Sequence, residues 1–273
     1  MWFRFFAADK PREHALAQAV GQGIRDAGHT FDILPSSLWA RTDECDVACI
    51  WGVKNPSRAL YERCMRTDKR FLFFDKGITM RKGRDNRYRV SLDALYPTKY
   101  LMRKKRNADR FRSSGVWFGD MEAPPGAPAL LLGSSQKAHD WHPDVYPRDA
   151  MQYYDSLAME IGPEPVIWRP KPSWRAAEPI PGTLPDPGGP LEEVLRGVSR
   201  VICTGSSGSF YAIAAGVPVR IMRGFSNIAI PIEHLPFDVD TRWQFCANVC
   251  YTEWTLDEYR GGQWWDELRG LIE

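Results

Sequence analysis

The chain has 273 residues, of which 44% are hydrophobic and 12% aromatic, and its formal net charge is +2. These values exclude fibrous and disordered proteins, and the length allows one large domain or two small ones. No apolar run approaches the roughly 20 residues of a membrane span, and the N-terminus is too short and too soon charged for a signal peptide. A cytoplasmic protein without a membrane partner is expected.

The first half of the chain, residues 1–122, alternates strand and helix signals as an α/β unit does. Strands are expected at 3–8, 31–34, 46–51 and 71–74, and helices at 14–27 and 55–66. The second helix is expected to start with Asn55 as its N-cap and Pro56 at its first helical position. The strand over 71–74 would deliver Asp75 to the carboxyl edge of the sheet, where ligands bind in open α/β folds.

The second half, residues 128–273, begins after a segment rich in proline and glycine at 121–128, which predicts a hinge. Strands are expected at 129–132, 165–168 and 201–203, and helices near 148–159 and 191–197. The part from Cys246 to the end is predicted to be helical and apolar on one side. The pattern as a whole is typical of two α/β units in one chain.

The six cysteines form no Cys-x-x-Cys pair and lie mostly in apolar segments, so free buried thiols are expected. Cys246 and Cys250 lack a matching His or Cys pair that would complete a tetrahedral metal site. The five histidines have no metal-like spacing either. No dedicated metal site is therefore expected.

The most informative segment is 201–219, which is typical of a strand, a loop of small residues, a short helix and a second strand. Gly205 and Gly208 would let the backbone approach a ligand, and nearby serines would add hydroxyl donors to the amides at a helix N-terminus. The pattern predicts a phosphate site with contacts from Thr204, Gly205, Ser206 and Ser207. The alternative is an ordinary αβ unit whose serines only cap the helix.

Two other loops of the second half carry groups that could hold a phosphate. The loop after the strand at 129–132 supplies Gly133, Ser134, Ser135 and Lys137. The strand at 165–168 leads into Arg169 and Lys171, which two prolines stiffen. A preset Arg and Lys would neutralise the two charges of a diphosphate, and Arg binds two oxygens at once. The alternative is a surface loop with unrelated charges.

The charge of the chain is concentrated in one basic block. Between Lys76 and Arg112 there are thirteen Lys or Arg and three acids, a local balance of +10, which leaves −8 for the remainder. Aromatic residues are interleaved with the block, among them Tyr88, Phe111 and Trp117. Cations together with stacking surfaces favour nucleic-acid binding, although a solvated helix face would give the same run of charges. The predicted phosphate contacts are Lys76, Arg81, Lys99, Arg103, Lys104, Lys105 and Arg106.

A carboxylate that removes a proton from an acceptor hydroxyl would come from the first half. Asp75 is the first candidate because it ends a buried strand beside Lys76, and Asp9 and Asp120 come next. Each of them could instead cap a helix or a turn. His139 and His142 are alternatives, either as the base or as donors to a phosphate.

The segment Thr204-Gly205-Ser206-Ser207, continued by Ala212 and Gly216-Val217-Pro218-Val219, resembles the donor-site αβ unit of GT-B glycosyltransferases and related epimerases. The resemblance implies an α/β fold with two Rossmann-like halves that face each other across a cleft. It also implies that the nucleotide-sugar diphosphate binds at this helix N-terminus. A terminal helix often crosses back to the first half in such folds, and the C-terminal part is placed to do so.

Over nearly the whole chain, blocks such as Phe74-Asp75-Lys76-Gly77 and Trp168-Arg169-Pro170-Lys171-Pro172 resemble a group of phage-encoded proteins. Phages use GT-B enzymes to attach sugars to hydroxymethylated pyrimidines in DNA. We therefore expect a hexosyltransferase that takes sugar from a UDP-type nucleotide-sugar and works on double-stranded DNA in the infected host. No other cofactor is expected to be required, although a divalent ion could assist.

Two other classes of function stay open. A glycosyltransferase or nucleotide-sugar epimerase of surface polysaccharide synthesis would not need the basic block to touch DNA. A non-catalytic nucleic-acid-binding protein with a degenerate GT-B fold would bind DNA with a steep salt dependence but would bind no nucleotide-sugar.

Overall fold

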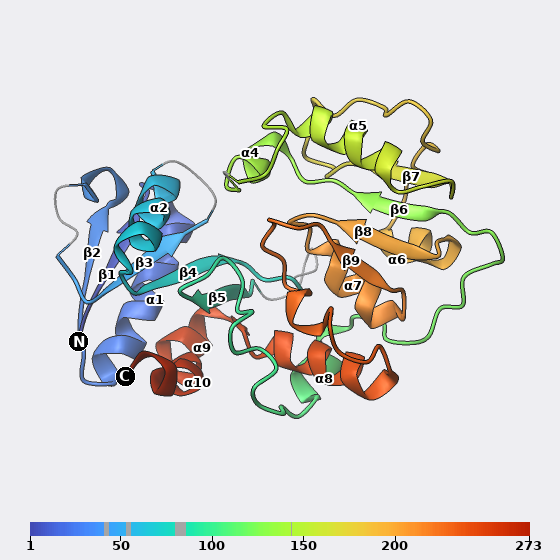
Figure 1. Ribbon diagram of the computed structural model, residues 1–273. Helices are drawn as coiled ribbons and strands as arrows, with labels where there is room; N and C mark the ends of the chain where they lie inside the picture. The colour runs from blue at the N-terminus through green and yellow to red at the C-terminus, as the bar shows by residue number, and fades with distance from the viewer. Residues whose placement is uncertain (41–43, 53–55, 80–85, 143) are drawn as a thin grey trace. The chain divides into compact units, whose positions relative to one another are not determined.

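The computed structural model describes residues 1–40, 44–52, 56–79, 86–142 and 144–273. The chain divides into two compact units, Met1–Lys99 with Val249–Glu273, and Tyr100–Asn248. Both are α/β units with a largely or wholly parallel sheet, as expected (Figure 1). Within the described ranges, no helix is both long and apolar enough to cross a lipid bilayer.

The first unit is built on a six-stranded sheet with the order β10-β5-β4-β3-β1-β2. The strands are β1 Trp2–Ala7, β2 Thr30–Pro35, β3 Val47–Trp51, β4 Phe71–Lys76, β5 Tyr88–Leu92 and β10 Glu253–Trp254. The first four pair in parallel, whereas β5 and β10 are antiparallel to their neighbours. The helices are α1 Pro11–Asp26, α2 Ser57–Thr67, α9 Leu256–Arg260 and α10 Gln263–Ile272, with a 3-10 turn, η1, at Ser36–Leu38. The expected N-cap Asn55 lies outside the described residues.

The C-terminal segment is part of the core of the first unit. The Trp265 ring packs edge-on against Phe3 with centroids 5.5 Å apart, and the Tyr259 hydroxyl donates to the Tyr88 carbonyl at 3.0 Å. The Arg70 guanidinium donates to the Leu271 carbonyl at 2.8 Å. The last 25 residues therefore complete a unit that begins at Met1.

The second unit contains a four-stranded parallel sheet with the order β7-β6-β8-β9. Its strands are β6 Ala129–Leu132, β7 Val166–Arg169, β8 Arg200–Cys203 and β9 Val219–Ile221. Its helices are α3 Asp109–Ser114, α4 Gln136–His139, α5 Ala150–Glu160, α6 Leu191–Val194, α7 Gly208–Ala215 and α8 Val239–Cys250, with 3-10 turns η2 Leu195–Gly197 and η3 Ile230–Ile232. Helix α8 ends two residues beyond the boundary of the unit.

Helices cover both faces of the second sheet (Figure 1), which explains why its two central strands, β6 and β8, are buried and apolar over most of their length. Ala129 and Leu131 of β6 pack with α5 in a core that includes Tyr154 and Trp168. Leu132 points to the other face, where its side chain approaches the first residue of α7. The alternation along β6 thus places α5 and α7 on opposite faces.

The boundary between the units lies at Lys99, not in the proline-rich segment at 121–128. Residues after Lys99 belong to the second unit because they bond to its helices. The amides of Gly119 and Met121 donate to the carbonyls of Ala214 and Ala215 at 3.0 and 2.9 Å. The Phe111 ring packs against Trp243 of α8 with centroids 5.3 Å apart. The basic block is consequently split between the two units.

Candidate functional site

The loop at 204–207 connects β8 to α7 and lies at the carboxyl edge of the second sheet. Thr204 is fully buried, and its hydroxyl lies 2.9 Å from the Ser134 hydroxyl and 2.7 Å from the Tyr154 hydroxyl. The Ser134 amide also donates to the Tyr154 oxygen at 2.6 Å. The structure therefore brings Ser134 and Thr204, two of the predicted donor contacts, next to each other, and their hydroxyls bond the two loops together.

A buried residue that the sequence did not single out, Asn227, holds the same loop from inside. Its side-chain amide donates to the carbonyls of Thr204 and Ser206 at 2.5 and 3.0 Å. Its side-chain oxygen accepts from the Ser209 hydroxyl at 2.7 Å and from the Ala229 amide at 2.9 Å. Asn227 lies in an irregular segment 20 residues after Ser207, so no local pattern reveals this role.

The outer side of the loop is accessible. Ser207 is exposed, Gly205 and Ser206 are half-buried, and Lys137 of α4 is exposed. The Ser207 hydroxyl forms no capping bond to α7, whereas the Ser206 hydroxyl accepts from the Gly208 amide at 3.2 Å. Ser135 precedes α4 without a side-chain capping bond. The loop thus presents small polar groups at the start of a helix, where an anion is favoured.

His142 lies beside this loop. The Cβ position of Gly205 is 3.9 Å from His142 Nε2 and 3.7 Å from the Ser134 hydroxyl oxygen. Burial, together with the neighbouring His139, lowers the pKa of His142 to about 4. The imidazole is therefore neutral at pH 7 and is able to donate one hydrogen bond and accept another. His139 is fully buried with Nε2 2.9 Å from the Pro147 carbonyl, which indicates a packing role.

The lowered pKa of His142 predicts a pH dependence of stability. Between pH 6.5 and about 4 the unfolded chain binds a proton at this residue and the folded chain does not. Acidification across this range therefore lowers the free energy of unfolding by about 3 kcal/mol. His142→Asn should lose less of its free energy of unfolding than the wild type when the pH falls from 7 to 4, as measured by denaturant titration. The exposed His234→Asn is the control; equal slopes for all three proteins would contradict the prediction.

Gly133 and Arg169, two predicted donor contacts, have structural partners. The Cβ position of Gly133 is 2.2 Å from the indole of Trp168, so glycine is required there by the packing of that ring. The Arg169 guanidinium is paired with Asp186 at 2.8 Å and donates to the Gly189 carbonyl at 2.7 Å. Its charge is thereby compensated within the loop. Lys171 is exposed, and no carboxylate pairs with it within the described part of the chain.

A cavity of about 330 Å³ lies between the carboxyl end of β7 and the loop that follows it. Its walls are mainly apolar, with Glu178, Thr183 and Asp186 as the polar side chains; the others are Trp168, Pro170, Ala177, Pro179, Ile180, Leu184 and Pro185. Residue Leu184 forms a parallel bridge with Ile167, which places this loop beside the edge strand of the sheet. The cavity and the loop at 204–207 therefore share the carboxyl edge of one sheet.

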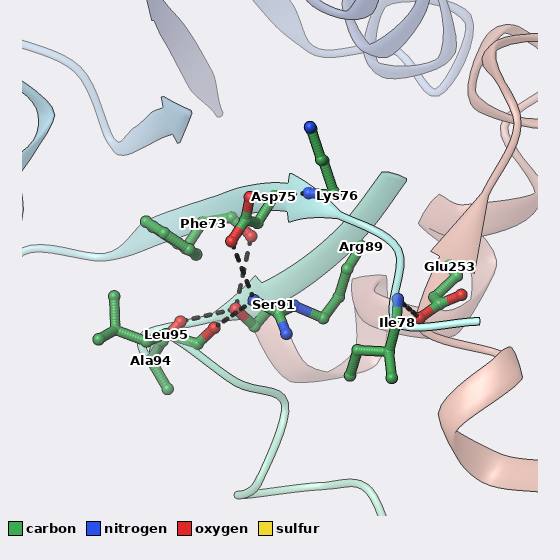
Figure 2. A network of polar contacts seen from close by, with 9 residues as sticks. All are labelled: Phe73, Asp75, Lys76, Ile78, Arg89, Ser91, Ala94, Leu95 and Glu253. Atoms are coloured by element: carbon green, nitrogen blue, oxygen red, sulfur yellow. Dashed lines mark hydrogen bonds and ion pairs between the residues drawn. The ribbon is translucent and has the colours of Figure 1, made fainter. Parts of the chain in front are cut away.

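In the first unit, Asp75 lies near the end of β4 in a row of charges across three strands (Figure 2). The sheet register pairs Asp75 with Arg89 of β5 and Arg89 with Glu253 of β10. Arg89 is buried, lies 3.6 Å from the Asp75 carboxylate and stacks 4.1 Å from the centre of the Tyr96 ring. The Asp75 side chain is one-third exposed and also accepts from the Lys76 amide at 2.8 Å. The carboxylate is thus held in place while it faces solvent.

Glu253 is the second carboxylate of this row and is fully buried. It accepts from the Ile78 amide (Figure 2). It also accepts from the Thr79 amide at 3.2 Å and from the Thr79 hydroxyl at 2.6 Å. The Cβ position of Gly77 is only 2.9 Å from its Oε2, so a larger residue would displace the carboxylate. Burial raises the pKa of Glu253, an effect that these donors and Arg89 oppose. Glu253, from β10, thereby fixes the turn at 77–79 that follows Asp75.

The other two carboxylates proposed from sequence differ from Asp75. Asp9 is fully exposed and lies 4.0 Å from the His14 imidazole. Asp120 pairs with Arg242, a buried arginine that also donates to the carbonyls of Gly119 and Ile213. The Asp120 carboxylate therefore helps to fix the segment at 119–120 within the second unit.

The basic block is only partly available to a ligand. Lys76, Lys99, Arg103, Lys104 and Lys105 are exposed, and in the described ranges no carboxylate pairs with any of them. Arg106 is half-buried, with its amide on Asn248 at 3.2 Å, and Arg81 lies outside the described residues. The expected stacking surfaces are fewer than predicted, because Tyr88 and Phe111 are buried and Trp117 is 44% exposed.

Comparisons with known proteins bear on the fold. No family model and no curated protein matches this sequence. Among solved structures, the chain is similar to the KpsC beta Kdo 2,7 transferase of Thermosulfurimonas dismutans, with a TM-score of 0.54, 10% identity, and 97% of this chain and 99% of that chain covered. It is also similar to the KpsC beta Kdo 2,4 transferase of that organism, with a TM-score of 0.50, 10% identity and 91% and 90% coverage. The predicted GT-B-like α/β fold is thereby confirmed.

Proposed function

We propose that this chain is a glycosyltransferase that moves a sugar from a UDP-type nucleotide-sugar to a hydroxymethylated pyrimidine in double-stranded DNA. The observation that carries the proposal is the accessible loop at 204–207 at the start of α7, within a fold similar to that of two transferases. Such an enzyme would act in the cytoplasm of a phage-infected bacterium. No further cofactor is part of the proposal, and a divalent ion could assist without a dedicated cage.

The donor is proposed to bind along the carboxyl edge of the second sheet. Its phosphates would contact the outer side of the loop at 204–207, with His142 as a neutral hydrogen-bond donor and Lys137 and Lys171 as cations. The cavity beside Trp168 would take the nucleobase, because its indole and proline walls suit a planar ring. These contacts would stabilise negative charge on the leaving phosphate as the bond to the sugar breaks.

Asp75 is proposed as the general base that removes the proton of the acceptor hydroxyl. Its carboxylate is accessible yet fixed by Arg89 and by the Lys76 amide, which favours a constant orientation toward a substrate. The DNA backbone is proposed to bind the exposed cations Lys99, Arg103, Lys104 and Lys105. Since base stacking needs exposed rings, Trp117 is the aromatic residue best suited to contact DNA.

A second candidate acceptor is a sugar hydroxyl of a surface polysaccharide. It is favoured by the likeness of nearly the whole chain to the two Kdo transferases, together with the burial of two of the expected stacking rings, Tyr88 and Phe111. This alternative keeps the same donor site and the same base. It differs only in what the basic block does.

The two acceptors are separated by transfer of labelled sugar to DNA with 5-hydroxymethylcytosine or 5-hydroxymethyluracil, to unmodified DNA and to oligosaccharides. Label on hydroxymethylated DNA alone is expected. Replacing both Lys104 and Lys105 with Glu should then reduce transfer to DNA at least tenfold without weakening donor binding, since these side chains are exposed and belong to the basic block. Label on oligosaccharide alone, unchanged in this variant, would refute the DNA acceptor.

A further inference from the structure

The side chain of Asn227 uses all of its hydrogen-bonding capacity on the loop at 204–207 and on residues next to this loop. It is fully buried, its amide group donates to two carbonyls, and its oxygen accepts from two donors. A primary amide has two N–H groups and two lone pairs, so this arrangement saturates it. Few other side chains could supply two donors and two acceptor sites from one position.

These bonds fix the orientation of the peptide between Ser206 and Ser207. In a trans peptide the carbonyl of one residue and the N–H of the next point in opposite directions. The buried Asn227 amide donates to the Ser206 carbonyl at 3.0 Å, so this carbonyl points to the interior of the unit. The Ser209 hydroxyl lies 3.1 Å from the same carbonyl. The N–H of Ser207 is therefore turned outward, to the side on which Ser207 is exposed.

The outward amide lies where a phosphate would be recognised. Ser207 directly precedes α7, whose N-terminus favours negative charge, and the Gly208 amide is already occupied by the Ser206 hydroxyl at 3.2 Å. The amide and hydroxyl of Ser207 are thus two donors on the accessible face of the loop. Their direction depends on a buried side chain that touches no ligand.

We propose that Asn227 is a positioning residue, which holds the 206–207 peptide so that the Ser207 N–H donates to a phosphoryl oxygen of the nucleotide-sugar. This inference rests on the proposed donor site. It adds the Ser207 N–H as the group that recognises the phosphate and Asn227 as the residue that orients this N–H. It does not depend on which acceptor the enzyme uses.

The test is nucleotide affinity, measured by calorimetry with UDP, and with CMP, GDP and TDP in parallel. Asn227→Ala should weaken the binding of the preferred nucleotide roughly ten- to hundredfold, the effect of losing a hydrogen bond to a charged group. Asn248→Ala is the matched control: it is a buried amide of the same unit that bonds Arg106 and Gln244 and does not touch the loop. It should lower the melting temperature similarly and leave the affinity unchanged.

A second pair of variants addresses the amide itself. Ser207→Pro and Ser207→Ala both lose the hydroxyl, but only proline also removes the N–H, and the φ of −68° at Ser207 suits proline. The proline variant should bind nucleotide at least tenfold more weakly than the alanine variant. Adding Asn227→Ala to Ser207→Pro should weaken binding little further, because both changes remove one interaction.

The outcomes separate this inference from the proposed function. A wild-type protein that binds none of the nucleotides would refute both. If the wild type binds a nucleotide and the affinity of Asn227→Ala is within threefold of the wild-type affinity, the positioning role alone is overturned. The same conclusion follows if the losses of affinity caused by Asn227→Ala and Ser207→Pro multiply in the double variant. Should Asn227→Ala not fold, Ser209→Ala keeps Asn227 but removes one of its partners, and is expected to weaken binding about two- to tenfold. Unchanged affinity in that variant would then overturn the role.

Discussion

Asp75→Asn is expected to lower the rate of sugar transfer by about 10²–10⁴-fold while the affinity for the nucleotide stays the same. The asparagine keeps the size and one oxygen of the side chain but cannot accept the proton of the acceptor hydroxyl, and general base catalysis contributes about that factor. Donor affinity should be unaffected because the donor site belongs to the other unit of the chain. The measurement is kcat under saturating acceptor, together with calorimetry for the nucleotide.

The control for this prediction is Asp26→Asn, an exposed residue of α1 that bonds Gln22. It should leave kcat unchanged. Full activity of Asp75→Asn would remove Asp75 as the base. The same loss of kcat in the control would indicate a general effect of charge on the first unit.

Glu253→Ala is expected to lower the free energy of unfolding by about 3–5 kcal/mol, because each buried donor that is left without an acceptor costs about 1–3 kcal/mol. The change leaves the amides of Ile78 and Thr79 and the Thr79 hydroxyl without an acceptor in a buried position. It also removes the carboxylate beside Arg89 in the sheet. Denaturant unfolding followed by tryptophan fluorescence measures the effect, because Trp254, Trp264 and Trp265 lie in the same unit.

Glu62→Ala provides the contrast. Glu62 forms a partly exposed ion pair with Arg58 at 2.7 Å, and such a pair contributes at most about 1 kcal/mol. If Glu253→Ala cost no more than Glu62→Ala, the buried network would not hold the turn at 77–79. The transferase rate of any folded Glu253 variant would show whether this turn also matters for Asp75.

Local patterns were sufficient to predict the parallel sheets. The apolar runs at 71–74, 129–132 and 201–203 are strands because both faces of each sheet are covered. The Gly- and Ser-rich segment after β8 was correctly expected to enter a helix. Such features follow from residues close together in sequence.

Other features were not predicted because they depend on distant partners. Residues 88–92 alternate apolar and polar side chains, but their position inside the basic block favoured a charged surface, whereas all five are buried in β5. Arg89 is tolerated there because Asp75, Tyr96 and the Leu95 carbonyl surround it. The pairing of Glu253 with Thr79 joins residues 174 positions apart, and that of Asn227 with Thr204 joins residues 23 apart.

Several side chains that were predicted to contact the nucleotide-sugar bond other residues of the protein instead. Thr204 and Ser134 bond each other, and Arg169 is compensated by Asp186. The donors that remain accessible are Ser135, Ser206, Ser207, His142 and the exposed lysines. A sequence shows which groups are present near a loop. It does not show which of them are already occupied by other parts of the protein.

The central claim, that this chain uses a nucleotide-sugar, is tested most directly by nucleotide release from a panel of UDP-, GDP-, TDP- and CMP-sugars. The purified full chain would be assayed with hydroxymethylated DNA, with an oligosaccharide acceptor and without any acceptor. The account predicts that one donor is turned over and that one acceptor class accelerates the release. A folded protein that binds and cleaves none of these donors would contradict it.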